Sequence, residues 1–250
     1  MDINFNDFQK TIRKQFMPSG ERLAELAQKK LEMNNIEKNF NLFLKQLLKI
    51  EFDLYKEFEK KCTIKIFDEA FKQKIFEIPK DDFKKTFSDF FNKYYNDFWN
   101  VFLSISQSRK ARAGGSFERH LEFLFSRLNY PYATQTQLNG RVDYLFPSEK
   151  VFTKNRTSCL IISVKRTLRE RWRQVVGELA SIKADKIYIV TQEQDISEKK
   201  IKEMEKHNID LVVFDEEKEK NFSDHHNVIS FTDLVSVHFP AKEKLWNQYM

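Results

Sequence analysis

Four short apolar runs in the second half of the chain constrain the fold more than any other feature. They are rich in β-branched and aromatic residues and too short to be buried helices: RVDYLF at 141–146, CLIISV at 159–164, KIYIV at 186–190 and DLVVF at 210–214. Segments with helical spacing of apolar residues stand around and between them, at 116–128, 169–182 and 197–207. This alternation predicts an α/β fold in which a β-sheet is flanked by helices.

The first part of the chain differs in composition and in the spacing of its apolar residues. Most of the 25 phenylalanines lie in it. Their spacing is helical, as in the series Phe83, Phe87, Phe90, Phe91, Phe98 and Phe102. We interpret 1–105 as an all-helical N-terminal domain that serves DNA binding or dimerisation. Aromatic side chains at helical spacing could stack on nucleotides, but burial statistics favour a place in the helical core.

A basic stretch that contains glycines, SQSRKARAGG at 106–115, separates the phenylalanine-rich first part from the part with the apolar runs. We interpret it as a linker, so that a second domain spans 106–250. Its cations Arg109, Lys110 and Arg112 are candidates for phosphate contacts. The alternative is a solvated basic linker with no partner.

The overall composition indicates what kinds of partner, cysteine chemistry and location to expect. The 43 Lys and Arg exceed the 37 Asp and Glu, which favours a polyanionic partner without requiring one. Cys62 and Cys159 fit neither a disulfide framework nor a zinc-ligand spacing, so buried reduced thiols are expected. No stretch has the length and apolar character of a membrane span or a signal peptide, and the expected location is the cytoplasm.

Two charged residues mark the ends of expected strands. Asp143 lies in the run at 141–146, and Lys165 closes the otherwise apolar run at 159–164. Side chains alternate along a strand, so Ser163 and Lys165 share one face. Phosphodiester hydrolysis needs carboxylates for a divalent cation and a positive group near the attacking water.

An aspartate on one strand and a lysine at the end of the next resembles the PD-(D/E)xK nuclease superfamily, whose fold is a mixed β-sheet flanked by helices. That superfamily usually has an acid two residues before the lysine, where this chain has Ser163. Glu178, on the following helical segment, is similar to the relocated acid of the EcoRII, PspGI and NgoMIV group. The resemblance implies that Asp143, Lys165 and Glu178 are catalytic, and that Asp143 and Glu178 hold Mg²⁺.

The stretch after the lysine extends the resemblance. In the same group an Arg/Lys, acid, Arg cluster reads CC and GG bases, and here it stands as Arg169, Glu170 and Arg171. Guanidinium groups can bind guanine O6 and N7, and a glutamate can accept from cytosine N4. The group also has a helix acid near the metal, for which Glu118 is the first candidate and Glu122 the second.

Together these features imply a type II restriction endonuclease. It would act as a homodimer on double-stranded DNA, with Mg²⁺-dependent double-strand cuts at a palindrome containing CC/GG and 5′-phosphate ends. CCGG-centred, CC-N-GG and CC-W-GG sites remain open. The alternatives are a repair or junction-resolving nuclease of the same superfamily, which would need no base-reading cluster, and an inactive sequence-specific DNA-binding protein, suggested by Ser163.

Overall fold

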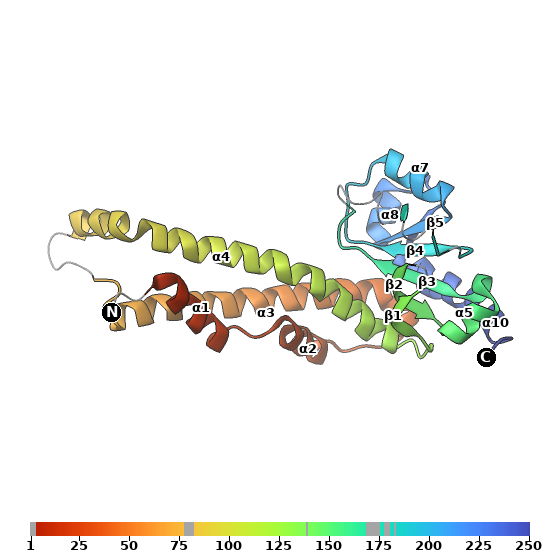
Figure 1. Ribbon diagram of the computed structural model, residues 1–250, viewed down its shortest axis with the longest axis horizontal. Helices are drawn as coiled ribbons and strands as arrows, with labels where there is room; N and C mark the ends of the chain where they lie inside the picture. The colour runs from red at the N-terminus through yellow and green to blue at the C-terminus, as the bar shows by residue number, and fades with distance from the viewer. Residues whose placement is uncertain (1–3, 78–82, 139, 169–175, 178–180, 183) are drawn as a thin grey trace. The chain divides into compact units, whose positions relative to one another are not determined.

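The computed structural model describes residues 4–77, 83–138, 140–168, 176–177, 181–182 and 184–250 (Figure 1). The chain forms two compact units. Unit 1 consists of Met1–Glu32 and Gln46–His120, and unit 2 consists of Met33–Lys45 and Leu121–Met250. The two long helices, α3 (Ile36–Lys72) and α4 (Phe83–Ser126), each contribute to both units.

Unit 1 is helical, as expected for the N-terminal part. Beside the long helices it contains α1 (Phe5–Phe16) and α2 (Gly20–Lys30), and Ser19 caps α2 by accepting from the backbone N–H of Arg22. Its core joins buried residues of α1, α3 and α4 and of the turn after α3: Phe5, Ile12, Cys62, Ile66, Ala70, Phe76, Tyr94, Val101 and Ile105. Part of the phenylalanine series is therefore core, but Phe87, Phe91 and Phe102 are exposed, contrary to our interpretation of the whole series.

The expected linker is helical instead. Helix α4 runs through 106–115 without interruption, even though this stretch contains glycines. Its continuation to Ser126 buries Phe117, Leu121 and Leu124, and the turn after it buries Leu128. Glycine has a low helix propensity, so Gly114 and Gly115 by themselves disfavour a helix here. The packing of apolar residues on both sides of this stretch outweighs that cost. The division into domains at residue 106 stays a prediction.

Unit 2 contains one six-stranded sheet with the strands in sequence order. They are β1 (Ala133–Gln137), β2 (Arg141–Phe146), β3 (Leu160–Val164), β4 (Ile187–Val190), β5 (Ile209–Val213) and β6 (Val228–Ser230). β1, β2 and β3 pair antiparallel, and β3 to β6 pair parallel, so the sheet is mixed. All four apolar runs are strands, which confirms the expected α/β class.

Two strands escaped the sequence reading. β1 is the polar stretch ATQTQ at one edge of the sheet, and β6 is only three residues long at the other edge. Edge strands need no apolar residues on both faces, so their composition carries little signal.

Short helices connect and cover the strands. They are α5 (Glu149–Lys154), η1 (Arg156–Ser158), α7 (Glu198–Lys206), α8 (Asp215–Asn221), α9 (Phe231–Asp233), η2 (Leu234–His238) and α10 (Phe239–Trp246). An aromatic cluster packs the ends of α3 and α4 against the sheet, with Phe125 in contact with Phe40, Tyr144 and Phe146. Residues 33–45 thus belong to the core of unit 2, although more than seventy residues separate them along the chain from its other segment, which begins at Leu121.

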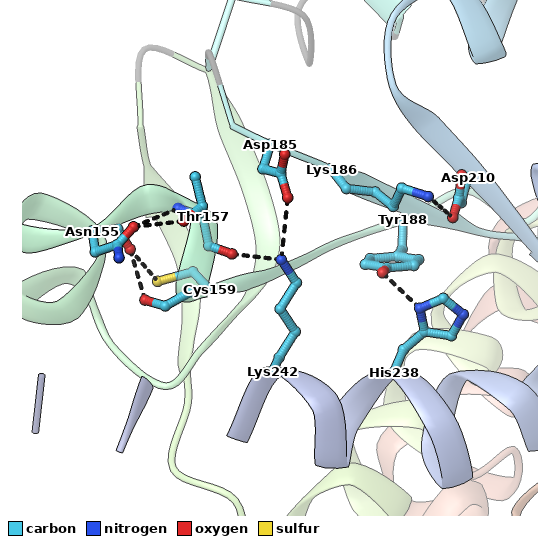
Figure 2. Close-up of polar contacts among 10 residues, drawn as sticks. Asn155, Thr157, Cys159, Asp185, Lys186, Tyr188, Asp210, His238 and Lys242 are labelled. Atoms are coloured by element: carbon cyan, nitrogen blue, oxygen red, sulfur yellow. Dashed lines mark hydrogen bonds and ion pairs between the residues drawn. The ribbon is translucent and has the colours of Figure 1, made fainter. Parts of the chain in front are cut away.

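A polar network ties the last helices to the sheet (Figure 2). The Tyr188 hydroxyl and His238 Nδ1 lie 2.9 Å apart, and Lys186 Nζ donates to Asp210 Oδ2 at 2.8 Å. Lys242, on α10, donates to the carbonyl of Thr157 at 2.5 Å. The first contact ties η2 to β4, the second joins the residue before β4 to β5, and the third ties α10 to η1.

Both cysteines are buried free thiols, as expected. Burial raises the pKa of Cys62 and raises that of Cys159 to about 11, so neither is a reactive thiolate near neutral pH. In the described ranges, no helix has the length and apolar character needed to cross a membrane.

Candidate active site

The β2–β3 pairing places Asp143 beside Ser163. Tyr144 pairs with Ile162 in the antiparallel register, so the next pair toward the open end of the hairpin is Asp143 with Ser163. Asp143 Oδ2 accepts a hydrogen bond from the backbone N–H of Val164 at 2.6 Å and one from the Ser163 hydroxyl at 3.2 Å. β3 thus fixes one carboxylate oxygen of β2 with two donors.

Lys165 lies at the same place. It follows the last residue of β3, and its backbone N–H donates to the carbonyl of Val190 on β4. Its ammonium nitrogen is 3.9 Å from Asp143 Oδ2, too far for a hydrogen bond, and the side chain is 37% exposed. The structure therefore brings together Asp143 and Lys165, and among the residues that it describes the Lys165 ammonium group donates no hydrogen bond.

The chain after Lys165 is bound to the end of β4. The carbonyl of Arg166 accepts from the Thr191 hydroxyl at 3.2 Å and from the backbone N–H of Gln192 at 3.3 Å. The Glu193 carboxylate accepts from the backbone N–H of Leu168. These bonds hold the exit of β3, and Glu193 is a residue that the sequence analysis did not single out.

Gln135 is a second residue that sequence reasoning missed. It lies opposite Asp143 in the β1–β2 register, between the paired positions Thr134 and Thr136. Its Nε2 donates to Asp143 Oδ1 at 3.3 Å, and its Oε1 accepts from Arg141 Nε at 2.7 Å. Its φ of 53° is in the left-handed region that side chains other than glycine rarely adopt. Nothing in ATQTQ signals this conformation.

The other expected site residues lie in unit 1 or outside the described part. Glu118 is on an exposed turn of α4. Arg109 forms an ion pair with Glu59, which raises its pKa. Arg112 donates to the carbonyl of Pro18 at 2.6 Å, lies over the Tyr55 ring, and has its pKa lowered by burial.

Four of the predicted site residues are not among those that the structure describes. Glu178 and the cluster Arg169, Glu170 and Arg171 fall in 169–175 and 178–180, and the side chain of Lys110 is likewise outside the description. In the described ranges, no three His, Cys, Asp or Glu side chains gather as metal ligands. The expectation that Asp143 and Glu178 hold a metal ion therefore stays a prediction.

The chain matches known proteins over most of its length. A family model described as EcoRII C terminal matches residues 55–235. The type II restriction enzyme SsoII of Shigella sonnei is 29% identical over 169 residues, covering 64% of this chain and 55% of the relative. The type II restriction enzyme EcoRII of Escherichia coli is 34% identical over 116 residues, covering 44% of this chain and 28% of the relative. The chain thus spans about half and about a quarter of these relatives.

Solved structures support the fold. Metal-depleted Ecl18kI in complex with uncleaved DNA aligns with a TM-score of 0.80 at 24% identity, covering 97% of this chain and 86% of that one. The PspGI–substrate DNA complex aligns with a TM-score of 0.57 at 18% identity, covering 98% and 94%. The mixed sheet with a preceding helical part is therefore the restriction-endonuclease fold expected from the sequence. Since the family model covers more than half of the chain, this protein belongs to the EcoRII C-terminal family.

Proposed function

We propose that this chain is a type II restriction endonuclease that makes Mg²⁺-dependent double-strand cuts at a short palindrome containing CC/GG. The observation that carries the proposal is the pairing of Asp143 on β2 with Lys165 at the end of β3, 3.9 Å apart, in a member of the EcoRII C-terminal family. The relatives SsoII and EcoRII are named type II restriction enzymes, and Ecl18kI and PspGI were solved with DNA.

The oxygen ligands proposed for this site suit magnesium. Asp143 and the proposed second acid Glu178 offer carboxylate oxygens, the donor type that Mg²⁺ prefers. Bound there, Mg²⁺ would lower the pKa of a coordinated water and offset the negative charge of the scissile phosphate.

The residues of the chain itself divide the remaining work. Val164 N–H and Ser163 hold one oxygen of Asp143, and Gln135 donates to the other, so the carboxylate is oriented before DNA binds. Lys165 directs its ammonium to the attacking water and the charge on the phosphate. The water oxygen bonds to phosphorus in line and gives up a proton to solvent. The bond between phosphorus and the 3′ oxygen breaks, and the leaving oxygen takes a proton from solvent. The products are 5′-phosphate and 3′-hydroxyl ends.

Base reading is assigned to Arg169, Glu170 and Arg171, with phosphate contacts from Arg109, Lys110 and Arg112 and a supporting acid at Glu118. The hydrogen-bonding capacity of two arginines and a glutamate matches the major-groove edges of two G·C pairs. A palindrome is read most simply by a two-fold homodimer.

Digestion of a plasmid of known sequence tests the activity. In Mg²⁺ we expect discrete double-strand cuts, and sequencing of the ends gives the site and the cut position. Asp143→Ala, Lys165→Ala and Glu178→Ala should each reduce the cleavage rate by roughly 10²-fold or more while DNA binding survives. Sequence-specific binding with no cleavage under any divalent cation would support the inactive DNA-binding protein instead.

Glu170→Ala tests the recognition cluster. Removing a negative charge strengthens binding to any duplex by electrostatics. If Glu170 reads cytosine, the variant should instead lose preference for CC/GG duplexes by a factor of about 5 to 100. Equal gains for duplexes with and without CC/GG would show that the cluster is a solvated surface.

A further inference from the structure

Glu193 lies in the loop after β4 and joins three parts of unit 2. Its carboxylate oxygen Oε2 accepts a hydrogen bond from the backbone N–H of Leu168, in the segment that follows β3. Its other oxygen, Oε1, is 3.8 Å from Lys200 Nζ on α7. Its own backbone N–H donates to the Thr191 hydroxyl at 3.1 Å. The carboxylate is therefore held between the loop, α7 and the segment after β3.

The bond from Leu168 to Glu193 is of a strong type. A carboxylate that accepts from a backbone N–H makes a stronger hydrogen bond than a neutral acceptor does. The side chains of Glu193 and Lys200 are 15% and 19% exposed, so little water competes for the carboxylate. Leu168 is itself buried, and both its side chain and its backbone N–H are thus fixed. Leu168 is a well-defined end point for the chain that leaves β3.

Lys165 does not depend on Glu193 for its position. Its backbone N–H donates to the carbonyl of Val190 at 2.9 Å, which continues the pairing of β3 with β4. The carbonyl of Arg166 is also held by the loop after β4. Glu193 acts two residues later, at Leu168. The segment after β3 therefore has two separate anchors, one at Lys165 and Arg166 and one at Leu168.

The second anchor comes directly before the residues proposed to read bases. A peptide bond joins Leu168 to Arg169, the first residue of the cluster Arg169, Glu170 and Arg171. A guanidinium group that binds guanine through two hydrogen bonds needs a fixed geometry, which depends on the groups that support it. Fixing the start of a binding segment in advance also reduces the entropy lost on binding. An anchor at Leu168 can supply both advantages.

We propose that Glu193 is a positioning residue for base recognition and acts through the backbone N–H of Leu168. Its loss weakens the discrimination between DNA sites and leaves the chemical step at Lys165 nearly unchanged, because the two anchors are separate. The proposal rests on the proposed function. It deepens that function by naming a residue outside the recognition cluster on which specificity depends. A residue that only stabilised the loop would change stability and leave discrimination as it is.

Cleavage of two duplexes tests the proposal. One duplex carries the site that plasmid digestion identifies, and the other has one G·C pair of its CC/GG element replaced by A·T. The measured quantity is the ratio of kcat/KM for the two duplexes. Glu193→Ala should lower this ratio by about 5- to 100-fold, the range expected when one bidentate arginine contact is lost. The single-turnover rate on the first duplex at saturating enzyme should stay within a few-fold of the wild-type rate.

Two further variants separate the hydrogen bond from the charge. Glu193→Gln keeps an oxygen acceptor at the same distance from the backbone and should retain the wild-type ratio. Glu193→Asp keeps the charge but is one methylene shorter, so it should lose discrimination as Glu193→Ala does. Asp195→Ala is the matched control, because Asp195 is an exposed acid of the same loop and its removal changes the net charge equally. It should leave the ratio unchanged.

Amide hydrogen exchange gives a readout that needs no DNA. The Leu168 amide should exchange at least about tenfold faster in Glu193→Ala than in the wild type or in Glu193→Gln, with the amides of β3 and β4 as internal references. Unchanged exchange at Leu168 would overturn the proposal. So would a wild-type ratio in both Glu193→Ala and Glu193→Asp, or an equal fall of the ratio in Asp195→Ala.

Failure of the proposed function looks different from failure of this inference. A wild-type chain that cuts no DNA, or that cuts without preference for CC/GG, would contradict the function itself, and exchange at Leu168 would still show whether Glu193 holds the segment. A wild-type chain that cuts at CC/GG sites, with discrimination that does not respond to Glu193→Ala, would contradict the role of Glu193 alone.

Discussion

An aspartate and a lysine meet at two places on the same sheet, with different results. At the end of β3, Lys165 Nζ is 3.9 Å from Asp143, whose side chain is 16% exposed. On β4 and β5, Lys186 Nζ is 2.8 Å from Asp210, whose side chain is 5% exposed (Figure 2). We call the first pair open, because its two ions are not hydrogen-bonded to each other, and the second pair closed, because they are.

The difference lies in what else contacts each carboxylate. Asp143 is held by Val164, Ser163 and Gln135, so its position does not depend on Lys165. Asp210 depends on Lys186, and even with this partner burial raises its pKa above the ordinary value. A pair serves chemistry when other groups orient the carboxylate and the lysine keeps free donors. A pair serves stability when the two ions satisfy each other.

The largest contrast is expected from removing the two lysines. Lys165→Ala should lower the single-turnover cleavage rate by roughly 10²- to 10⁴-fold with little change in the free energy of unfolding. Lys186→Ala should leave cleavage within a few-fold. The substitution should lower the free energy of unfolding in urea by about 1–2 kcal/mol, because it leaves the buried Asp210 carboxylate without its cation. The loss is modest because Lys186 is itself partly exposed to solvent. Loss of cleavage without loss of stability in Lys186→Ala would break the distinction.

A smaller effect is expected at Gln135. Gln135→Ala removes the hydrogen-bond donor to Asp143 Oδ1 and should lower the cleavage rate by about tenfold. The Mg²⁺ concentration at half-maximal rate should rise, because a group that hydrogen-bonds to a metal-binding carboxylate orients it and tunes metal affinity. Gln135→Glu should be worse, since it sets one carboxylate against another. Gln137→Ala is the control, on the same strand and equally exposed to solvent. Equal effects of Gln135→Ala and Gln137→Ala would show that β1 acts only through its backbone.

The smallest effect concerns pH and the closed pair's neighbour, His238. Burial lowers the pKa of His238 below its ordinary value, with the charges of Asp210 and Lys186 opposing each other. The unfolded chain therefore takes up this proton first, so the contribution to stability is complete above about pH 6.5 and falls as the pH drops below it. Between pH 8 and 5.5 the wild-type Tm should fall about 2 °C more than that of His238→Asn. His207→Asn, at an exposed site on α7, should track the wild type.

The sequence alone determined four of the six strands and half of the candidate site. The apolar runs behind β2, β3, β4 and β5 are long and regular enough for local pattern to decide their structure. Strand alternation also put Ser163 and Lys165 on one face, and Asp143 near the end of a strand. For these residues, the position of each within its own strand was enough to predict where it lies.

Long-range packing decided the rest. The 3.9 Å between Asp143 and Lys165 depends on the β2–β3 register, and the role of Gln135 depends on a left-handed backbone in an edge strand. The place of residues 33–45 in unit 2 comes from contacts such as Phe40 with Phe125. A helical spacing of aromatic residues is the same whether the partner is the chain's own core or another surface. Only the fold showed that Tyr94 is buried while Tyr95 faces solvent, because burial is set by neighbours distant in sequence.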